Sequence, residues 1–194
     1  MRIGILAVQG DFREHKRAVE SLGAKTIEVR TPNELNETDG LIIPGGESTV
    51  ISRLLRRWGR FEEIRSNAIN GYPLFGTCAG MILLAKSLKG SQVKTLELMD
   101  ITVRRNAYGR QIESFEAELK LSGSIKDKVK GVFIRAPQIV RIGNEVEIIS
   151  SYQDRPVIVR QENMLASSFH PELTDNSLVH KYFLEELVSE FVAL

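Results

Sequence analysis

The sequence predicts an α/β fold with a mainly parallel central sheet. In the first half, short apolar runs typical of buried strands alternate with segments of helical periodicity, and this alternation indicates βαβ units. In the second half the apolar runs are short, partly alternate with polar residues and are separated by turn residues, which favours antiparallel strands. A cysteine flanked by glycines follows the fourth predicted strand, where a sharp turn into a helix is expected.

The composition bounds the class of protein. At 194 residues, 42% of them hydrophobic, the chain can bury a sheet covered on both faces, and we expect one domain over residues 1–194. A net charge of +1 gives no support for binding nucleic acid or a membrane surface. No apolar run approaches the roughly 18 residues of a membrane span. The single cysteine cannot form an internal disulfide, which favours a reducing compartment and a cytoplasmic location.

The first half begins with a buried strand and a helix. Ile3–Val8 is a continuous apolar run, as expected of a central parallel strand. Arg13–Leu22 carries apolar residues at helical spacing, and Gly23 would end that helix. The elements predicted next are strands at Thr26–Val29, Gly40–Ile43 and Pro73–Phe75, helices at Val50–Trp58 and Phe61–Ile69, and a loop with one helical turn at Pro32–Asp39.

The second half contains six short β-rich runs. They are Ile101–Arg105, Ser114–Leu121, Gly131–Ile134, Val146–Tyr152, Pro156–Arg160 and Met164–Phe169. We expect antiparallel additions, plus one or two strands that complete the main sheet. Asn176–Leu194 has apolar residues near helical spacing and is predicted as a closing helix.

The cysteine Cys78 stands in the pattern of a nucleophile elbow. Gly76 precedes it by two residues and Gly80 follows it by two, which leaves room for a very tight turn. The helix that starts at Ala79 would place N–H groups and a partial positive charge near the sulfur and so favour the thiolate. Alternatively, Cys78 is only a small buried hydrophobic residue, and the pentapeptide alone does not decide between the two.

The chain has three histidines that could serve a thiolate as base. His15 lies in the charged start of the first predicted helix, and His180 lies in the closing helix, where an exposed position is expected. His170 stands just past the apolar run Met164–Phe169. Reactive groups of open α/β sheets gather beyond the carboxyl ends of strands, so His170 is the predicted base.

A carboxylate stands near this histidine. Pro171 favours an extended backbone at His170, and alternate residues of an extended segment point to the same side. Glu172 is therefore expected to meet the far imidazole nitrogen and orient the ring. Alone, such a pair is more often two exposed polar side chains or half of a metal site. A metal site is disfavoured here because the sequence has no cluster of His, Cys or Asp at the spacing of further metal ligands. With Cys78 it predicts a Cys–His–Glu triad.

A second loop, Pro44–Thr49, is expected at the same sheet edge. We expect the N–H groups of Gly46 and Ala79 to form an oxyanion hole, and the two adjacent glycines would allow a peptide flip. A phosphate cradle is one alternative, although the lysine of that motif is absent. A tight turn before a capped helix is the other.

These motifs resemble the class I, or triad, glutamine amidotransferases. The elbow and the His-Pro-Glu segment carry that resemblance, and further segments resemble the glutaminase subunits of pyridoxal 5'-phosphate synthases in particular. The further segments are Ala7–Asp11, Ile43–Thr49, Arg105–Gln111, Phe133–Pro137 and Phe169–Thr174. They are distributed over nearly the whole chain, and together they are very specific.

The resemblance implies a flavodoxin-like, three-layer glutaminase that hydrolyses L-glutamine to glutamate and ammonia. The ammonia would pass through a tunnel to a synthase subunit in a hetero-oligomer that builds pyridoxal 5'-phosphate, and the isolated chain would be weakly active. Cys78 would be the nucleophile, with His170 and Glu172 completing the triad. The residues that would hold glutamine are Gly46, Glu47, Ser48, Arg105, Ile134 and Arg135. No cofactor and no metal are expected.

The residue types suit this substrate. Arginine suits the carboxylate of glutamine through a charge-assisted fork, and Glu47 suits its ammonium; a structural ion pair is the alternative for Arg105 and Arg135. The chain departs from the family pattern at two positions. Ile82 replaces a glutamine found in many triad amidotransferases, which argues against the carbamoyl phosphate, GMP or anthranilate types. Arg104 stands where an acidic residue is expected.

Three other functions remain open. The chain could be the glutaminase subunit of another amidotransferase. It could be a cysteine hydrolase or chaperone resembling the PfpI/DJ-1 group, although Ala79 and Gln9 occupy the places where that group usually has histidine and glutamate. It could also be a flavodoxin-like binding module without catalysis.

Overall fold

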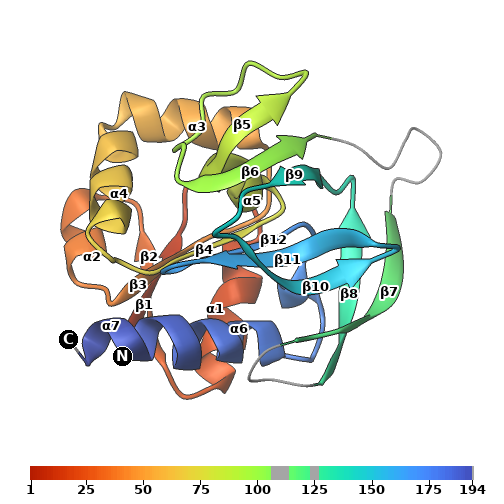
Figure 1. Ribbon diagram of the computed structural model, residues 1–194. Coiled ribbons are helices and arrows are strands. Elements are labelled where there is room, and N and C mark those ends of the chain that lie inside the picture. Colours follow the sequence, from red (N-terminus) through yellow and green to blue (C-terminus); the bar gives the residue numbers. More distant parts are fainter. Residues whose placement is uncertain (106–113, 123–126, 194) are drawn as a thin grey trace.

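The computed structural model describes residues 1–105, 114–122 and 127–193. Its centre is a seven-stranded sheet of order β10-β11-β12-β4-β3-β1-β2 (Figure 1). These strands are β1 (Arg2–Leu6), β2 (Lys25–Val29), β3 (Gly40–Ile43), β4 (Leu74–Thr77), β10 (Glu147–Tyr152), β11 (Arg155–Gln161) and β12 (Met164–Ser167). The strands from β2 to β12 are parallel, whereas β11 and β10 add antiparallel at the edge. The predicted α/β fold with a mainly parallel sheet is confirmed.

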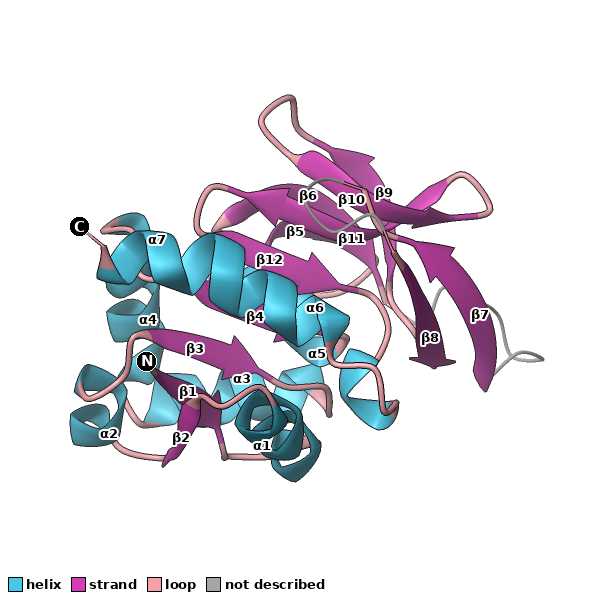
Figure 2. Cartoon of the chain, turned by 90° about the horizontal axis from the view of Figure 1, so that it is seen from below, coloured by secondary structure: helices cyan, strands magenta, loops and turns pink. Residues whose placement is uncertain are grey.

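Helices cover both faces of this sheet (Figures 1 and 2). One face carries α1 (Phe12–Ser21) and the closing helix, which consists of α6 (Leu178–Tyr182), the π-helical segment η2 (Phe183–Val188) and α7 (Ser189–Val192). The other face carries α3 (Ser48–Arg57), α4 (Arg60–Ile69) and α5 (Ala79–Leu84), and α2 (Pro32–Asn36) packs beside β2.

Successive side chains of the central strands pack alternately into two hydrophobic cores, one on each face of the sheet. Ile42 packs with α1 and the closing helix, whereas its neighbour Ile43 packs with α3, α4 and α5. This division follows from the two-residue period of a strand, which sends successive side chains to opposite faces. It accounts for the nearly continuous apolar runs of the parallel strands.

Two small sheets complete the second half. One joins β5 (Ala85–Lys89), β6 (Met99–Arg104) and β9 (Gln138–Ile142), and the other is the antiparallel pair β7 (Ser114–Lys120) and β8 (Lys128–Ile134). The sequence did not predict β5 or β9. The helix after the elbow ends at Leu84, and the chain then pairs with β6.

The closing helix differs from its prediction in two ways. It begins at Leu178 instead of Asn176, and its middle is π-helical, with the Ser189 hydroxyl donating to the Leu184 carbonyl at 3.0 Å. Its predicted last residue Leu194, and residues 106–111 of the Arg105–Gln111 motif, lie outside the described part of the chain.

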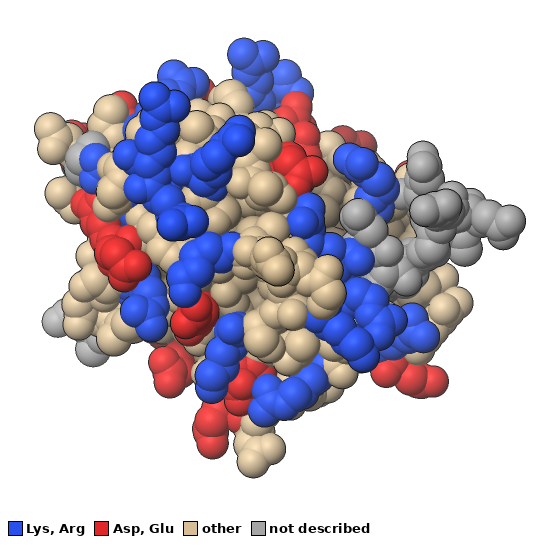
Figure 3. Space-filling view, turned by 90° about the horizontal axis from the view of Figure 1, so that it is seen from above, with Lys and Arg blue, Asp and Glu red and all other residues tan. Residues whose placement is uncertain are grey.

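Surface charge is of both signs. Figure 3 shows that Lys and Arg cover more of the face seen from above than Asp and Glu do, although the net charge of the whole chain is only +1. Among the described residues, no helix is both long and apolar enough to cross a membrane.

Candidate active site

Cys78 occupies the sharp turn between β4 and α5. Its backbone angles are φ 48° and ψ −99°, a conformation that residues other than glycine rarely adopt. A Cβ on Gly76 would lie 2.6 Å from the carbonyl carbon of Gly80, and one on Gly80 would collide with the carbonyl oxygen of Ile43. Both glycines are therefore sterically required, as the elbow pattern predicts.

His170 reaches Cys78 because β4 and β12 are parallel neighbours. Thr77 and Ser167 are paired across these strands, so the elbow and the segment after β12 leave the sheet side by side. The Cys78 N–H also donates to the Ser167 carbonyl at 2.8 Å. The His170 ring packs so closely on Gly45 that any Cβ at Gly45 would collide with it.

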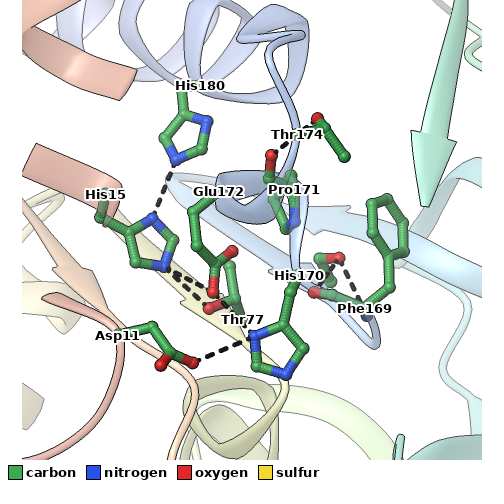
Figure 4. A network of polar contacts seen from close by, with 10 residues as sticks. Asp11, His15, Thr77, Phe169, His170, Pro171, Glu172, Thr174 and His180 are labelled. Atoms are coloured by element: carbon green, nitrogen blue, oxygen red, sulfur yellow. Dashed lines mark hydrogen bonds and ion pairs between the residues drawn. The ribbon is translucent and has the colours of Figure 1, made fainter. Parts of the chain in front are cut away.

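Glu172 contacts the imidazole as predicted, but the backbone route differs. Pro171–Leu173 forms a 3₁₀ turn, η1, instead of an extended segment. His170 Nδ1 lies 2.8 Å from Glu172 Oε1 and 3.4 Å from Asp11 Oδ2 (Figure 4). Glu172 is 6% exposed and His170 4% exposed, so this contact is shielded from water.

The pKa values of this pair shift in opposite directions. Burial lowers the pKa of His170, but hydrogen bonds with Asp11, Cys78 and Glu172 outweigh burial and raise it to about 12. Burial raises the pKa of Glu172, but His15 and then His170 bring it well below its usual range. The site therefore favours an imidazolium beside the cysteine and an ionised carboxylate behind it.

A cavity of about 350 Å³ opens in front of Cys78 and His170, a volume within the range of small-molecule sites. It brings together most of the predicted site residues, including those of the loop after β3. The residues that line it are Gln9, Asp11, Gly46, Glu47, Ser48, Cys78, Ile82, Arg105, Ile134, Arg135 and His170.

Two predicted residues lie just outside that lining. Glu172 lies behind the His170 ring, and Ala79, the first residue of α5, is buried next to Cys78. The unexpected Arg104 lies beside a separate hollow with Gln138 and Arg155.

The loop after β3 is held by polar contacts within the cavity. The Glu47 N–H donates to Gln9 Oε1 at 2.7 Å, and the Asp11 N–H donates to the Gly45 carbonyl at 3.2 Å. Arg105 forms an ion pair with Glu47 at 2.9 Å. The loop after β1 thus supports the loop after β3, a role for Gln9 and Asp11 that the sequence did not indicate.

His15 and His180 were also missed as site residues. His180 was expected to be exposed, but it is fully buried, and its Nε2 lies 2.8 Å from Nδ1 of the equally buried His15. Periodicity contained a signal: Phe183, Leu184 and Leu187 follow His180 at the spacing of one apolar helix face. Predicting the contact between two helices 165 residues apart required the fold.

One group of described residues could hold a metal ion. Asp11, His170 and Glu172 each place a ligand atom within 4.8 Å of the others. The Nδ1 atom of His170 already has a hydrogen bond to Glu172. The His170 and Glu172 atoms that could bind a metal therefore already form the hydrogen bond of an acid–base pair.

Comparison with known proteins assigns the family. The SNO glutamine amidotransferase family matches residues 5–189. The chain is 48% identical over 191 residues to the pyridoxal 5'-phosphate synthase subunit PdxT of Fervidobacterium nodosum, covering 98% of this chain and 99% of that protein. It is 52% identical over 184 residues to PdxT of Geobacillus thermodenitrificans, covering 95% and 94%.

A solved structure agrees with this assignment. A crystal structure of a glutamine amidotransferase superposes with a TM-score of 0.91, at 49% identity over 96% of this chain and 98% of that chain. The chain therefore belongs to the SNO glutamine amidotransferase family, as the sequence motifs predict.

Proposed function

We propose that the chain hydrolyses L-glutamine to L-glutamate and ammonia through a thioester on Cys78, and delivers the ammonia to the synthase subunit of a pyridoxal 5'-phosphate synthase. One observation carries the chemistry: Cys78 and His170 leave adjacent parallel strands and line one cavity with the glycine loop after β3. The name of the relatives, pyridoxal 5'-phosphate synthase subunit, supports the partner.

Glutamine would bind by replacing an existing ion pair between Arg105 and Glu47 with its own contacts to each of these side chains. Arg105 and Glu47 contact each other at 2.9 Å at the cavity, and the carboxylate and ammonium of an amino acid match these two charges. Ser48 is only 2% exposed, and its hydroxyl has no hydrogen-bond partner among the described residues. Because buried polar groups are normally satisfied, a polar group of glutamine is its expected partner. Ile134 and Arg135 complete the binding site from the end of β8.

The first half of the reaction forms the thioester. Cys78 attacks the side-chain amide carbon of glutamine, and the oxyanion that forms accepts hydrogen bonds from the N–H groups of Gly46 and Ala79. Protonated His170 gives its proton to the departing nitrogen, and ammonia leaves. Glu172 stabilises the imidazolium through its 2.8 Å contact with Nδ1.

The second half releases glutamate. His170, now neutral, takes a proton from water, and the hydroxide attacks the thioester carbon. The same two N–H groups hold the second oxyanion. When it collapses, the carbon–sulfur bond breaks, glutamate leaves and Cys78 is again a thiolate beside protonated His170.

We further propose one glutaminase domain over residues 1–194, located in the cytoplasm. Both hydrophobic cores contain residues of the central sheet, which supports a single unit. The lone cysteine supports a reducing compartment.

Ammonia release from glutamine, measured with and without the synthase subunit, tests this function. We expect slow release by the isolated chain and faster release in the complex. Cys78→Ala should abolish release in both states because no other residue supplies the nucleophile. His170→Asn should also lose it, since the amide cannot shuttle a proton.

Circular dichroism serves as the control for folding of both variants. Ammonia release by folded Cys78→Ala would refute the assigned nucleophile. Equal, high release by the isolated chain and the complex would refute activation by the synthase.

A further inference from the structure

His15 and His180 form a buried polar unit behind the triad that the mechanism above does not use. His15 comes from α1 and His180 from α6, and both side chains are fully buried. His15 Nε2 lies 3.0 Å from Thr77 Oγ1 and 3.4 Å from Glu172 Oε1 (Figure 4). The unit therefore contacts both the carboxylate of the proposed triad and the residue directly before Cys78.

One assignment of the ring hydrogens fits these contacts when His15 is neutral. A carboxylate only accepts hydrogen bonds, so His15 Nε2 faces Glu172 favourably when it is protonated. In a neutral ring Nδ1 then accepts, and His180 Nε2 donates to it at 2.8 Å. That leaves His180 Nδ1 without hydrogen, in agreement with its having no hydrogen-bond partner among the described residues. With these hydrogens, His180 donates to His15, and His15 Nε2 donates to Thr77 Oγ1 at 3.0 Å while lying 3.4 Å from Glu172 Oε1.

Glu172 needs this donor. Its Oε2 atom is buried and has no partner among the described residues, so the carboxylate is held through Oε1 alone. His170 and His15 both contact Oε1, at 2.8 and 3.4 Å. Without His15, the group that orients His170 would keep one donor, and a buried carboxylate with so few donors is costly and free to turn.

We propose that His15 and His180 are positioning residues, which hold Glu172 and thereby set the orientation of His170 toward Cys78. This inference rests on the proposed glutaminase function for its kinetic effect. The titratable groups that face His15 among the described residues are His180 from α6 and Glu172 from η1, and Asp11 from the loop after β1 contacts Glu172's partner His170.

Two substitutions at His15 separate hydrogen bonding from packing. His15→Phe keeps a ring of similar size without N–H groups, whereas His15→Gln retains an amide N–H near the position of Nε2. We expect His15→Phe to lower kcat of the complex with the synthase about 10- to 100-fold, by analogy with the loss of residues that orient metal ligands in other proteins. KM should change little because His15 does not line the cavity. His15→Gln should recover most of kcat.

His180→Phe and Val19→Ala complete the series. His180→Phe should lower kcat less than His15→Phe, and the double variant should be no slower than His15→Phe, because both act through one path. Val19 lies one turn after His15 on the same buried face of α1 but makes only apolar contacts. Val19→Ala should loosen this helix while leaving kcat close to the wild-type value.

Alkylation of Cys78 by iodoacetamide provides a readout that does not require glutaminase activity. Its rate as a function of pH follows the fraction of thiolate, which protonated His170 stabilises. In His15→Phe, as in His170→Asn, we expect the half-maximal rate at a higher pH than in wild type. His15→Gln should restore the wild-type profile.

These results separate the two proposals. If wild type with the synthase releases no ammonia, the proposed function fails, and the alkylation profiles still decide the role of His15. Wild-type kcat and a wild-type alkylation profile in folded His15→Phe would overturn the inference, as would an equal loss in Val19→Ala. If His15→Phe does not fold, wild-type behaviour of His180→Phe in both assays overturns it.

Discussion

The strained backbone of Cys78 is held by its neighbours. A positive φ at a residue other than glycine persists only where the surroundings impose it. Here the Cys78 N–H donates to Ser167 of β12, and Gly80 packs against the Ile43 carbonyl of β3. The two strands that flank β4 therefore fix the backbone from which the Cys78 side chain projects.

Gly45 is the residue whose size limits the position of His170. In Gly45→Ala the new methyl group would collide with the imidazole ring, so His170 must move away. Because small displacements of catalytic groups are costly, we expect glutaminase kcat to fall on the order of 10²-fold. The free energy of unfolding should fall by about 1–3 kcal/mol. Kinetics of the complex and urea unfolding measure the two effects.

Gly40→Ala is a matched control, because Gly40 begins the strand β3 and Gly45 lies in the loop that follows that strand. Gly40 lies at the opposite end of β3, where a methyl group would meet Val188 at 3.0 Å and Phe183 at 3.4 Å. It should destabilise the fold without lowering kcat. Unchanged kcat in Gly45→Ala would show that His170 tolerates displacement.

At the scale of elements, α1 and the closing helix are joined by polar as well as apolar contacts. Val19 and Phe183 lie in the same hydrophobic core, while His15 and His180 form a hydrogen bond inside it. The π-helical segment begins three residues after His180. Polar contacts of this kind specify how two helices dock, because sliding either helix would leave buried nitrogens unpaired.

Burial of His180 makes stability depend on pH. Burial, and then His15, lower the pKa of His180 from 6.5 to about 3. As the pH falls below 6.5, His180 becomes protonated in the unfolded chain but stays neutral in the folded chain. The free energy of unfolding therefore falls by about 1.4 kcal/mol per pH unit. In His180→Phe this contribution disappears. We therefore expect a shallower loss of unfolding free energy between pH 6.5 and 4.5, measured by urea unfolding.

The upper and lower limits of that window have physical reasons. Below 4.5 the lowered pKa of Glu172 adds its own loss of stability, and the raised pKa of His170 adds a loss only as the pH rises above 6.5. Val179→Ala, at a buried apolar neighbour in α6, should lower stability equally at each pH. The same slope in wild type and His180→Phe would contradict the assigned burial of a neutral histidine.

At the scale of the molecule, parallel strands bring distant residues to one edge. Gln9, Cys78 and His170 follow β1, β4 and β12, and the carboxyl ends of these strands lie together. The antiparallel additions then place Arg105, after β6, and Ile134, at the end of β8, on the same cavity. The central sheet thus positions the residues of the proposed triad, and the additions place further residues on the same cavity.

Features encoded locally were predictable from the sequence. The Gly-x-Cys-x-Gly turn, the parallel strands and the histidine past the last apolar run each depend on a few neighbouring residues. The contact of His170 with Glu172 was also predicted, although a 3₁₀ turn forms it instead of an extended segment. Two residues apart in sequence, these side chains can meet through more than one backbone path.

Features that depend on packing between distant segments were not predictable. Ala85–Lys89 lacks the β-branched residues typical of strands, and it becomes β5 only by pairing with β6. His15 and His180 each lie on an apolar helix face, which sequence periodicity can suggest. That these two faces meet behind Glu172 follows only from how α1 and α6 pack on the sheet.

Trapping the thioester tests the central claim most directly. The complex with the synthase is mixed with glutamine, quenched in acid within one turnover, and digested for mass spectrometry. We predict a γ-glutamyl group on the peptide that contains Cys78, with none in Cys78→Ala. In His170→Asn we predict far less, because thioester formation needs the proton of His170. Ammonia release by wild type without any modified Cys78, under conditions that preserve a thioester, would contradict the claim.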